Sequence, residues 1–163
     1  MALKLIAEGI ILIALLIIYC LIGIRGGAVG MVFLYDKKVQ DRSVELGLIT
    51  REAIRKNAIL FKAIGIASYA AYAIICAYVI NGARGFLEGF WQILTILLIC
   101  SVGDRLIIDE LWVCRTRAWV IPGTEEFMPY ISRRDKCKKW IFGTVGMAVI
   151  AAVLSGIMTI FGK

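Results

Sequence analysis

The chain has 163 residues, of which 61% are hydrophobic and 19% charged, and its net charge is +7. Its mean hydropathy is +0.85. A soluble domain is about 45–50% apolar with roughly a quarter of its residues charged, so this composition excludes a disordered chain and argues against a water-soluble domain. The chain contains no histidine, and its five cysteines form no Cys-x-x-Cys pair. Histidine-based catalysis and histidine-ligated metals are therefore excluded, and no zinc or dithiol site is supported.

Four apolar runs match the ~20 residues needed to cross ~30 Å of hydrocarbon. They cover about residues 5–24, 59–80, 90–112 and 140–162. The first run is longer than the apolar part of a signal peptide and has no small-x-small cleavage site after it, so we expect it to be retained. The sequence predicts an all-α polytopic membrane protein: one domain, residues 1–163, with four transmembrane helices and short cytoplasmic interfacial helices.

The lysines and arginines are distributed unequally between the connecting segments. Fourteen lie in loops 25–58 and 113–139. Three lie at the two ends of the chain and between the second and third spans, which a four-span topology places on the opposite side. The positive-inside rule predicts that both long loops face the cytoplasm and that both termini lie on the non-cytoplasmic side of the cell membrane. Together with attraction to anionic inner-leaflet headgroups, this topology explains the net charge without a nucleic-acid partner.

The first long loop is predicted to contain two helix starts. Residues 36–46 favour a short surface helix that ends at Gly47. Thr50 can cap a second helix, with Glu52 in its first turn, that continues without a break into the second span. The basic first turns of this helix would lie at the level of the lipid headgroups.

Small residues recur at every fourth position in two spans. The two rows are Thr144, Ala148, Ala152 and Gly156, and Ala63, Ala67 and Ala71. Small residues let helices approach closely in lipid. We therefore expect both rows to mark helix contacts, either within the bundle or between protomers.

The third span carries charged residues within its predicted membrane depth. Trp91 and Trp112 are 21 residues apart, about 32 Å along a helix, which matches one hydrocarbon thickness. With these tryptophans as interfacial anchors, Asp104 and Arg105 would lie about 10–12 Å inside the cytoplasmic boundary. A charge at this depth is costly unless it is paired or hydrated.

Two interpretations of these charges remain open. Asp109 follows Arg105 by four residues, so the pair can lock the third span as a structural network. Alternatively, Asp104, Arg105 and Asp109 form a polar pocket for a ligand, an ion or a lipid headgroup, which we favour because intramembrane ionisable residues are usually functional. On a straight α-helix Asp104 would lie about 100° from the Arg105 stripe, and Glu110 would point elsewhere.

Flanking residues could extend such a pocket. The glycines after the first span free the backbone at the same boundary and could present amides to a phosphate. The arginines after Trp112 can bind a phosphate or carboxylate, or contact lipid phosphates. The candidate ligand-binding residues are Asp104, Arg105, Asp109, Arg115, Arg117, Gly26 and Gly27.

These features support three functional hypotheses. The first is a small transporter, channel-like protein or membrane-complex subunit, acting as a homo-oligomer or with a partner and without a cofactor. It predicts a polar path that could include Glu8. The second is an enzyme acting on a lipid phosphate, with Mg²⁺ held by Asp104, Asp109 and Glu110. The third is a non-catalytic scaffold, in which every ion pair would be satisfied internally.

Overall fold

The computed structural model describes residues 1–161, and every regular element within them is helical. Four continuous helices are long and apolar enough to cross a membrane, which confirms the predicted number of candidate spans. They are Ala2–Ile24 (α1), Arg51–Ile74 with Ile75–Ile80 (α3, η2), Gly85–Gly103 with Asp104–Val113 (α4, η3), and Arg133–Ile141, Phe142–Gly146 and Met147–Phe161 (α5, η6, α6). Residue 162, the predicted end of the fourth span, lies outside the described residues.

The helices begin earlier than the apolar runs. The second starts at Arg51, as the Thr50 cap predicts, eight residues before its apolar run, and the fourth starts at Arg133 rather than near residue 140. The added turns are rich in lysine and arginine, which are good helix formers but lower the local hydropathy. Apolar runs mark the segment suited to lipid, whereas the helix extends as far as backbone propensity and capping allow.

The predicted helix signals in the first loop are confirmed. Thr50 Oγ1 accepts a hydrogen bond from the Ala53 amide at 3.2 Å, and Glu52 lies in the first turn of α3. The short helix α2 covers Lys37–Glu45, and Gly47 follows it with φ of +70°. A left-handed residue after a helix is the usual place for glycine, which has no side chain to strain.

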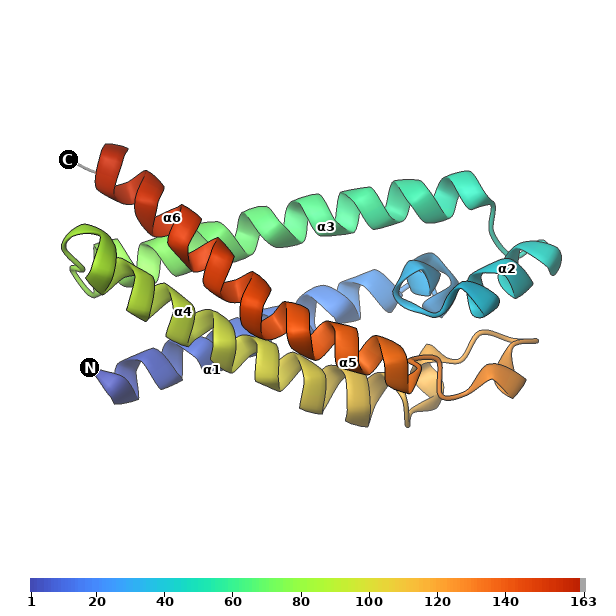
Figure 1. Cartoon of the computed structure of the whole chain (residues 1–163). Coiled ribbons are helices and arrows are strands. Elements are labelled where there is room, and N and C mark those ends of the chain that lie inside the picture. Colours follow the sequence, from blue (N-terminus) through green and yellow to red (C-terminus); the bar gives the residue numbers. More distant parts are fainter. Residues whose placement is uncertain (162–163) are drawn as a thin grey trace.

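The third span is the centre of the bundle. Figure 1 shows α4 between α1 and α6, and its most extensive contacts are with these two helices. Of its most apolar segment 44% is buried, against 17% in the second and fourth spans. Ile93, Ile96 and Leu97 form the middle of the apolar core there. The charged part of this span, η3, contacts α1, α5 and η4 on one side, whereas Leu106, Ile107 and Leu111 are exposed.

Within this single chain the predicted rows of small residues lie beside the most buried faces; Ala148 packs against the apolar core, and contacts of these rows between protomers stay a prediction. In the fourth span the buried row is Gly143, Ala151 and Ser155, one position before the predicted row, in which Thr144 is exposed. In the second span Ala63, Ala67 and Ala71 are exposed, whereas Ala73 and Ala77 are buried. Both faces of these helices contain small residues, so spacing alone could not identify the packed one.

The two long connections fold together at one end of the bundle, and the start of α1, the end of α6 and the short connection 81–84 lie at the other (Figure 1). We call residues 25–50 and 114–132 the loop cap. It contains α2 and three short helices, Ala28–Leu34 (η1), Arg117–Trp119 (η4) and Glu125–Phe127 (η5). Its core includes the fully buried Trp119 and Ile121.

Hydrogen bonds join the two halves of the loop cap. The Tyr35 hydroxyl donates to the Trp119 carbonyl at 2.7 Å, and the Asp36 amide donates to the Tyr130 carbonyl at 3.3 Å. Trp112, predicted to be an interfacial anchor, is half-buried and meets Trp119 edge-on with ring centroids 5.1 Å apart. Trp112 thus packs on the core of the cap, and the membrane depth inferred from it and Trp91 stays a prediction.

Candidate functional site

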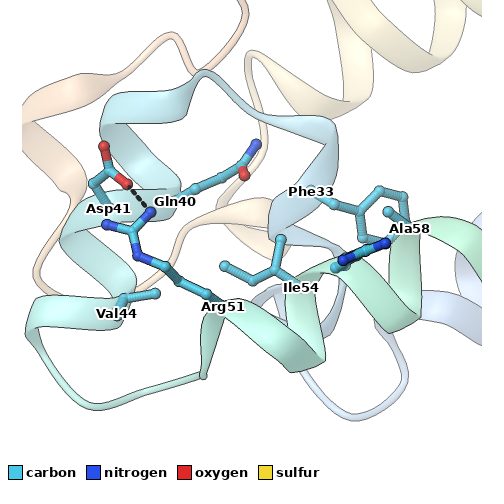
Figure 2. A pocket seen from close by; sticks show the side chains of 8 residues that line it. Phe33, Gln40, Asp41, Val44, Arg51, Ile54 and Ala58 are labelled. Carbon is cyan, nitrogen blue, oxygen red and sulfur yellow. Dashed lines mark ion pairs between the residues drawn. The ribbon is translucent and has the colours of Figure 1, made fainter.

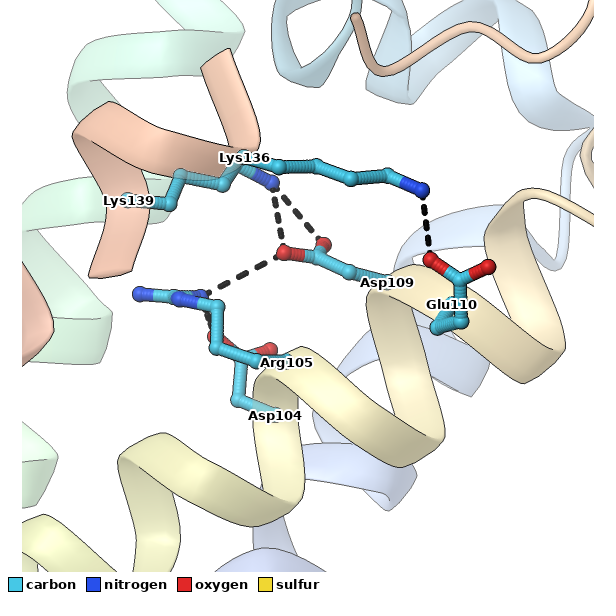
Figure 3. A network of polar contacts seen from close by, with 6 residues as sticks. All are labelled: Asp104, Arg105, Asp109, Glu110, Lys136 and Lys139. Atoms are coloured by element: carbon cyan, nitrogen blue, oxygen red, sulfur yellow. Dashed lines mark hydrogen bonds and ion pairs between the residues drawn. The ribbon is translucent and has the colours of Figure 1, made fainter. Parts of the chain in front are cut away.

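Three predicted site residues do come together, and a fourth residue completes the group. We call Asp104, Arg105, Asp109 and Lys139 the ionic cluster; the first three lie on η3 and Lys139 lies on α5 (Figure 3). Arg105 Nη1 binds Asp104 Oδ2 and lies 3.4 Å from Asp109 Oδ2. Lys139 Nζ lies 2.8 and 2.9 Å from the two Asp109 oxygens. The side chains of Arg105 and Asp109 are each only 10% exposed.

The winding of η3 explains why Asp104 belongs to the cluster. The segment is a π-helix; its last turn closes with a bond from the Cys114 amide to the Asp109 carbonyl, five residues back. Hydrogen bonds that span five residues widen the helical turn, so positions 104 and 109 lie closer to one side than on an α-helix. The predicted offset of Asp104 assumed a straight α-helix, and η3 is not one.

Two glycines let neighbouring helices approach the cluster. A β-carbon on Gly103 would collide with the Ile13 side chain of α1, and one on Gly143 would collide with Ser101 Oγ. The same β-carbon on Gly143 would lie 3.5 Å from Arg105 Nη2. The first and fourth spans therefore pack closely beside the cluster, in which the Asp104 and Lys139 side chains remain 26% and 29% exposed.

Glu110 belongs to a separate group of charges. It binds Lys136 of α5 and lies 3.5 Å from Arg115 Nη2. Within residues 1–161 no three acidic or cysteine side chains are grouped so that they could hold a metal ion. The carboxylates named for Mg²⁺, Asp104, Asp109 and Glu110, are thus each bound by basic side chains and do not converge.

The other predicted ligand-binding residues lie apart from the ionic cluster. Arg115 and Arg117 are exposed in the second half of the loop cap. Gly26 and Gly27 form the exposed turn between α1 and η1, where Gly27 has φ of +99°. This conformation explains the need for glycine at position 27, and it gives these two residues a role in ending the helix.

A cavity of about 310 Å³ lies where the loop cap meets the start of α3 (Figure 2). We call it the basic pocket; its lining residues are Phe33, Gln40, Asp41, Val44, Arg51, Ile54, Arg55 and Ala58. Arg51 Nη1 lies 2.9 Å from Asp41 Oδ1, and the Arg51 side chain is 70% exposed. The basic character of these turns was predictable from sequence, but the cavity was not, because α2 and η1 supply half of its wall.

The loop cap also contains acidic groups in an unusual environment. The pKa of Asp36 is raised to about 6, mainly by burial and next by the neighbouring Asp135 carboxylate. Ser132 and Lys38 lower this pKa by a smaller amount. Burial likewise raises the pKa of the Cys114 thiol. Asp36 precedes α2 and Asp135 lies in the first turn of α5, so this contact links the cap to the fourth span.

Comparison with protein-family models, curated proteins and solved structures finds no match to this chain. A function must therefore be supported by the geometry of the ionic cluster, the basic pocket and the loop cap. The ionic cluster contains two carboxylates and two basic groups, so its charges balance. The basic pocket contains Arg51, Arg55 and Asp41, which leaves one positive charge in excess.

Proposed function

We propose that the chain is a multi-pass protein of the cell membrane that binds the headgroup of an anionic phospholipid in the cytoplasmic leaflet. The loop cap would lie in the cytoplasm and both termini outside, in accordance with the positive-inside rule. The observation that carries this proposal is the basic pocket, an amphipathic cavity with an excess positive charge at the start of a candidate span. The homo-oligomer or larger complex expected from the sequence stays a prediction.

The position of Arg55 along α3 supports a headgroup as the ligand. The apolar part of this helix begins at Ile59, four residues later, which is about 6 Å along the helix axis. The headgroup region of a bilayer is about 5–7 Å thick on each side. A guanidinium there would meet lipid phosphates, while Phe33, Ile54 and Ala58 supply an apolar wall for the glycerol region.

The test is native mass spectrometry of the full chain in detergent. We expect dioleoylphosphatidylglycerol to bind more tightly than dioleoylphosphatidylcholine, which has no net charge. Arg55→Gln should weaken phosphatidylglycerol binding about fivefold, since a basic residue near an anionic surface contributes roughly 1 kcal/mol. Arg55 is preferable to Arg51 as the test residue because Arg51 also pairs with Asp41.

The control is Lys56→Gln, which makes the same change in charge on the adjacent, exposed residue outside the pocket. Glycerol 1-phosphate, added at equal concentration, distinguishes a lipid site from a site for free phosphate esters. The proposal is refuted if Arg55→Gln and Lys56→Gln weaken binding equally, or if the two phospholipids bind alike.

A second candidate function, transport of protons or a small cation, is favoured by a line of polar groups inside the bundle. Glu8 is only 6% exposed; its Oε2 accepts a hydrogen bond from Asn81 at 3.0 Å, and its Oε1 has no partner within residues 1–161. The Tyr72 hydroxyl donates to the Glu8 carbonyl at 2.9 Å, and Tyr69 contacts Cys100 at 3.6 Å. Cys100 lies one turn before Asp104, so polar groups lead from Glu8 toward the ionic cluster.

This candidate predicts proton flux in reconstituted vesicles. Vesicles containing a trapped pH dye and the full chain should acidify faster than protein-free vesicles when valinomycin imposes an inside-negative potential. Glu8→Gln should abolish the difference, and Thr95→Ala, which removes a hydroxyl that donates to the Trp91 carbonyl of its own helix, should preserve it. Equal rates with and without protein would refute transport of protons and leave lipid binding as the better-supported function.

A further inference from the structure

We infer that the groove between α1 and α3 holds an acyl chain of the same phospholipid whose headgroup occupies the basic pocket, which rests on the proposed function. The groove has a volume of about 260 Å³ and an apolar lining. We call it the apolar groove; its lining residues are Leu12, Leu15, Leu16, Ile18, Tyr19, Ile22, Gly65, Ser68, Tyr69 and Tyr72. The ligand is thus a glycerophospholipid bound along its length.

The basic pocket and the apolar groove lie on one face of α3. Arg51, Ile54, Arg55 and Ala58 line the pocket, and Gly65, Ser68, Tyr69 and Tyr72 line the groove. These positions follow the three- and four-residue spacing of one helix face, with Phe61 between the two sets, so they form one helical stripe. A molecule that leaves the pocket along this stripe therefore enters the groove.

Three aromatic rings connect the two sites. Phe33 lines the pocket and lies 5.4 Å, centroid to centroid, from Phe61. Phe61 stacks on Tyr19 at 4.5 Å, and Tyr19 lines the groove. The Tyr19 hydroxyl also donates to the Phe61 carbonyl at 3.1 Å, which joins α1 to α3 at this level. The rings provide an apolar surface where the glycerol backbone and first methylenes would lie.

The dimensions of the groove fit an acyl chain. Measured along α3 from Ala58, Gly65 lies about 10 Å and Tyr72 about 21 Å deeper. The midpoint of a ~30 Å hydrocarbon core, at a depth of ~15 Å, falls between these two residues. The volume of about 260 Å³ extends over the ~10 Å from Gly65 to Tyr72 along α3, so the groove is elongated. This shape suits a single extended acyl chain lying between the two helices.

The experiment compares two phosphatidylglycerols on the full chain by native mass spectrometry, one with dioleoyl and one with dihexanoyl chains. Gly65→Leu fills the groove, and the position tolerates a side chain because a β-carbon there would meet only Tyr19 Cε1, at 3.9 Å. Ala67→Leu adds a similar volume at the same depth, on an exposed face outside the groove. Both variants are checked for wild-type thermal stability, and Ser68→Leu replaces Gly65→Leu if the latter is unstable.

We expect the groove variant to weaken dioleoyl binding about threefold and leave dihexanoyl binding unchanged. The loss is small because a displaced acyl chain forfeits only dispersion contacts and returns to an equally apolar environment. Ala67→Leu should leave both lipids unchanged. Equal dioleoyl binding by Gly65→Leu and Ala67→Leu overturns the acyl-chain assignment, even where Arg55→Gln confirms the headgroup site. Loss of dioleoyl binding in Gly65→Leu with no effect of Arg55→Gln overturns the headgroup site and, with it, this inference.

Discussion

Replacing Lys139 with methionine should destabilise the protein more than any neighbouring lysine substitution. Lys139 Nζ lies within 2.9 Å of both Asp109 oxygens, and the Asp109 side chain is 10% exposed. Methionine retains most of the length and packing of the side chain but removes the charge. Asp109 would then have only Arg105, at 3.4 Å, and would share it with Asp104.

The magnitude follows from the number of charges left unpaired. Removing one partner of a fully buried ion pair costs about 3–5 kcal/mol. Here Lys139 is 29% exposed and Arg105 still offers partial compensation, so we expect a loss of about 2 kcal/mol in the free energy of unfolding. Adding Asp109→Asn removes the unpaired carboxylate and should recover roughly half of this loss.

The assay is reversible unfolding of the purified variants in mixed detergent micelles, followed by tryptophan fluorescence. Lys138→Met is the control, since Lys138 pairs with Asp135 at 3.5 Å and its side chain is 64% exposed. An exposed pair contributes about 0–1 kcal/mol. Equal stability of the Lys139→Met and Lys138→Met variants, or no recovery in the double variant, would refute a structural role for the ionic cluster.

Three further predictions concern other charged or reactive groups. Arg105→Ala should lower the free energy of unfolding by about 3 kcal/mol, whereas Arg42→Ala, which breaks an exposed pair with Glu45, should cost less than about 1 kcal/mol; equal losses in micelle unfolding would contradict this. The pKa of Asp36 is raised to about 6, so the stabilisation that its protonation gives the native state is present at acidic pH and is lost as the pH rises toward 6. Asp36→Asn should therefore be about 1 kcal/mol more stable than wild type at pH 8, allowing for solvent screening, and equal to it near pH 4, measured by unfolding at both pH values. Cys137 is exposed on α5, so a membrane-impermeant maleimide should label it in inside-out vesicles and not in intact cells; the reverse pattern would contradict the proposed orientation.

The helices were predictable because long apolar runs and capping residues are local signals. The four spans and the Thr50 and Gly47 boundaries depend on residues close in sequence. The packed faces of the helices were not predictable in this way, because Ala67 and Ala73 are equally small and only the position of α4 determines which is buried. The loop cap was missed for a related reason, since Tyr35 and Trp119 meet across 84 positions of the chain.

The candidate site was predicted in part for the same physical reason. Charges within the third span had to find partners, so Asp104, Arg105 and Asp109 could be grouped from the sequence alone. Lys139 could not be assigned, because it was predicted to lie in loop 113–139 and its pairing depends on the early start of the fourth helix at Arg133. The π-helical winding of η3 was also unpredictable, since it alters the angular positions on which helical stripes are based.

The ionic cluster and the basic pocket differ in whether a charged group is left without a partner and can bind a ligand. In the ionic cluster each carboxylate has a basic partner from the chain itself, so an incoming ion would have to displace Arg105 or Lys139 and leave a buried charge unpaired. In the basic pocket Arg51 is paired with Asp41, but the pocket also contains Arg55 and opens beside the apolar start of the second span. An anion could bind there without breaking an existing buried pair. The lower cost of binding, more than the depth of the charges, is why the pocket and not the cluster is the better candidate for a ligand.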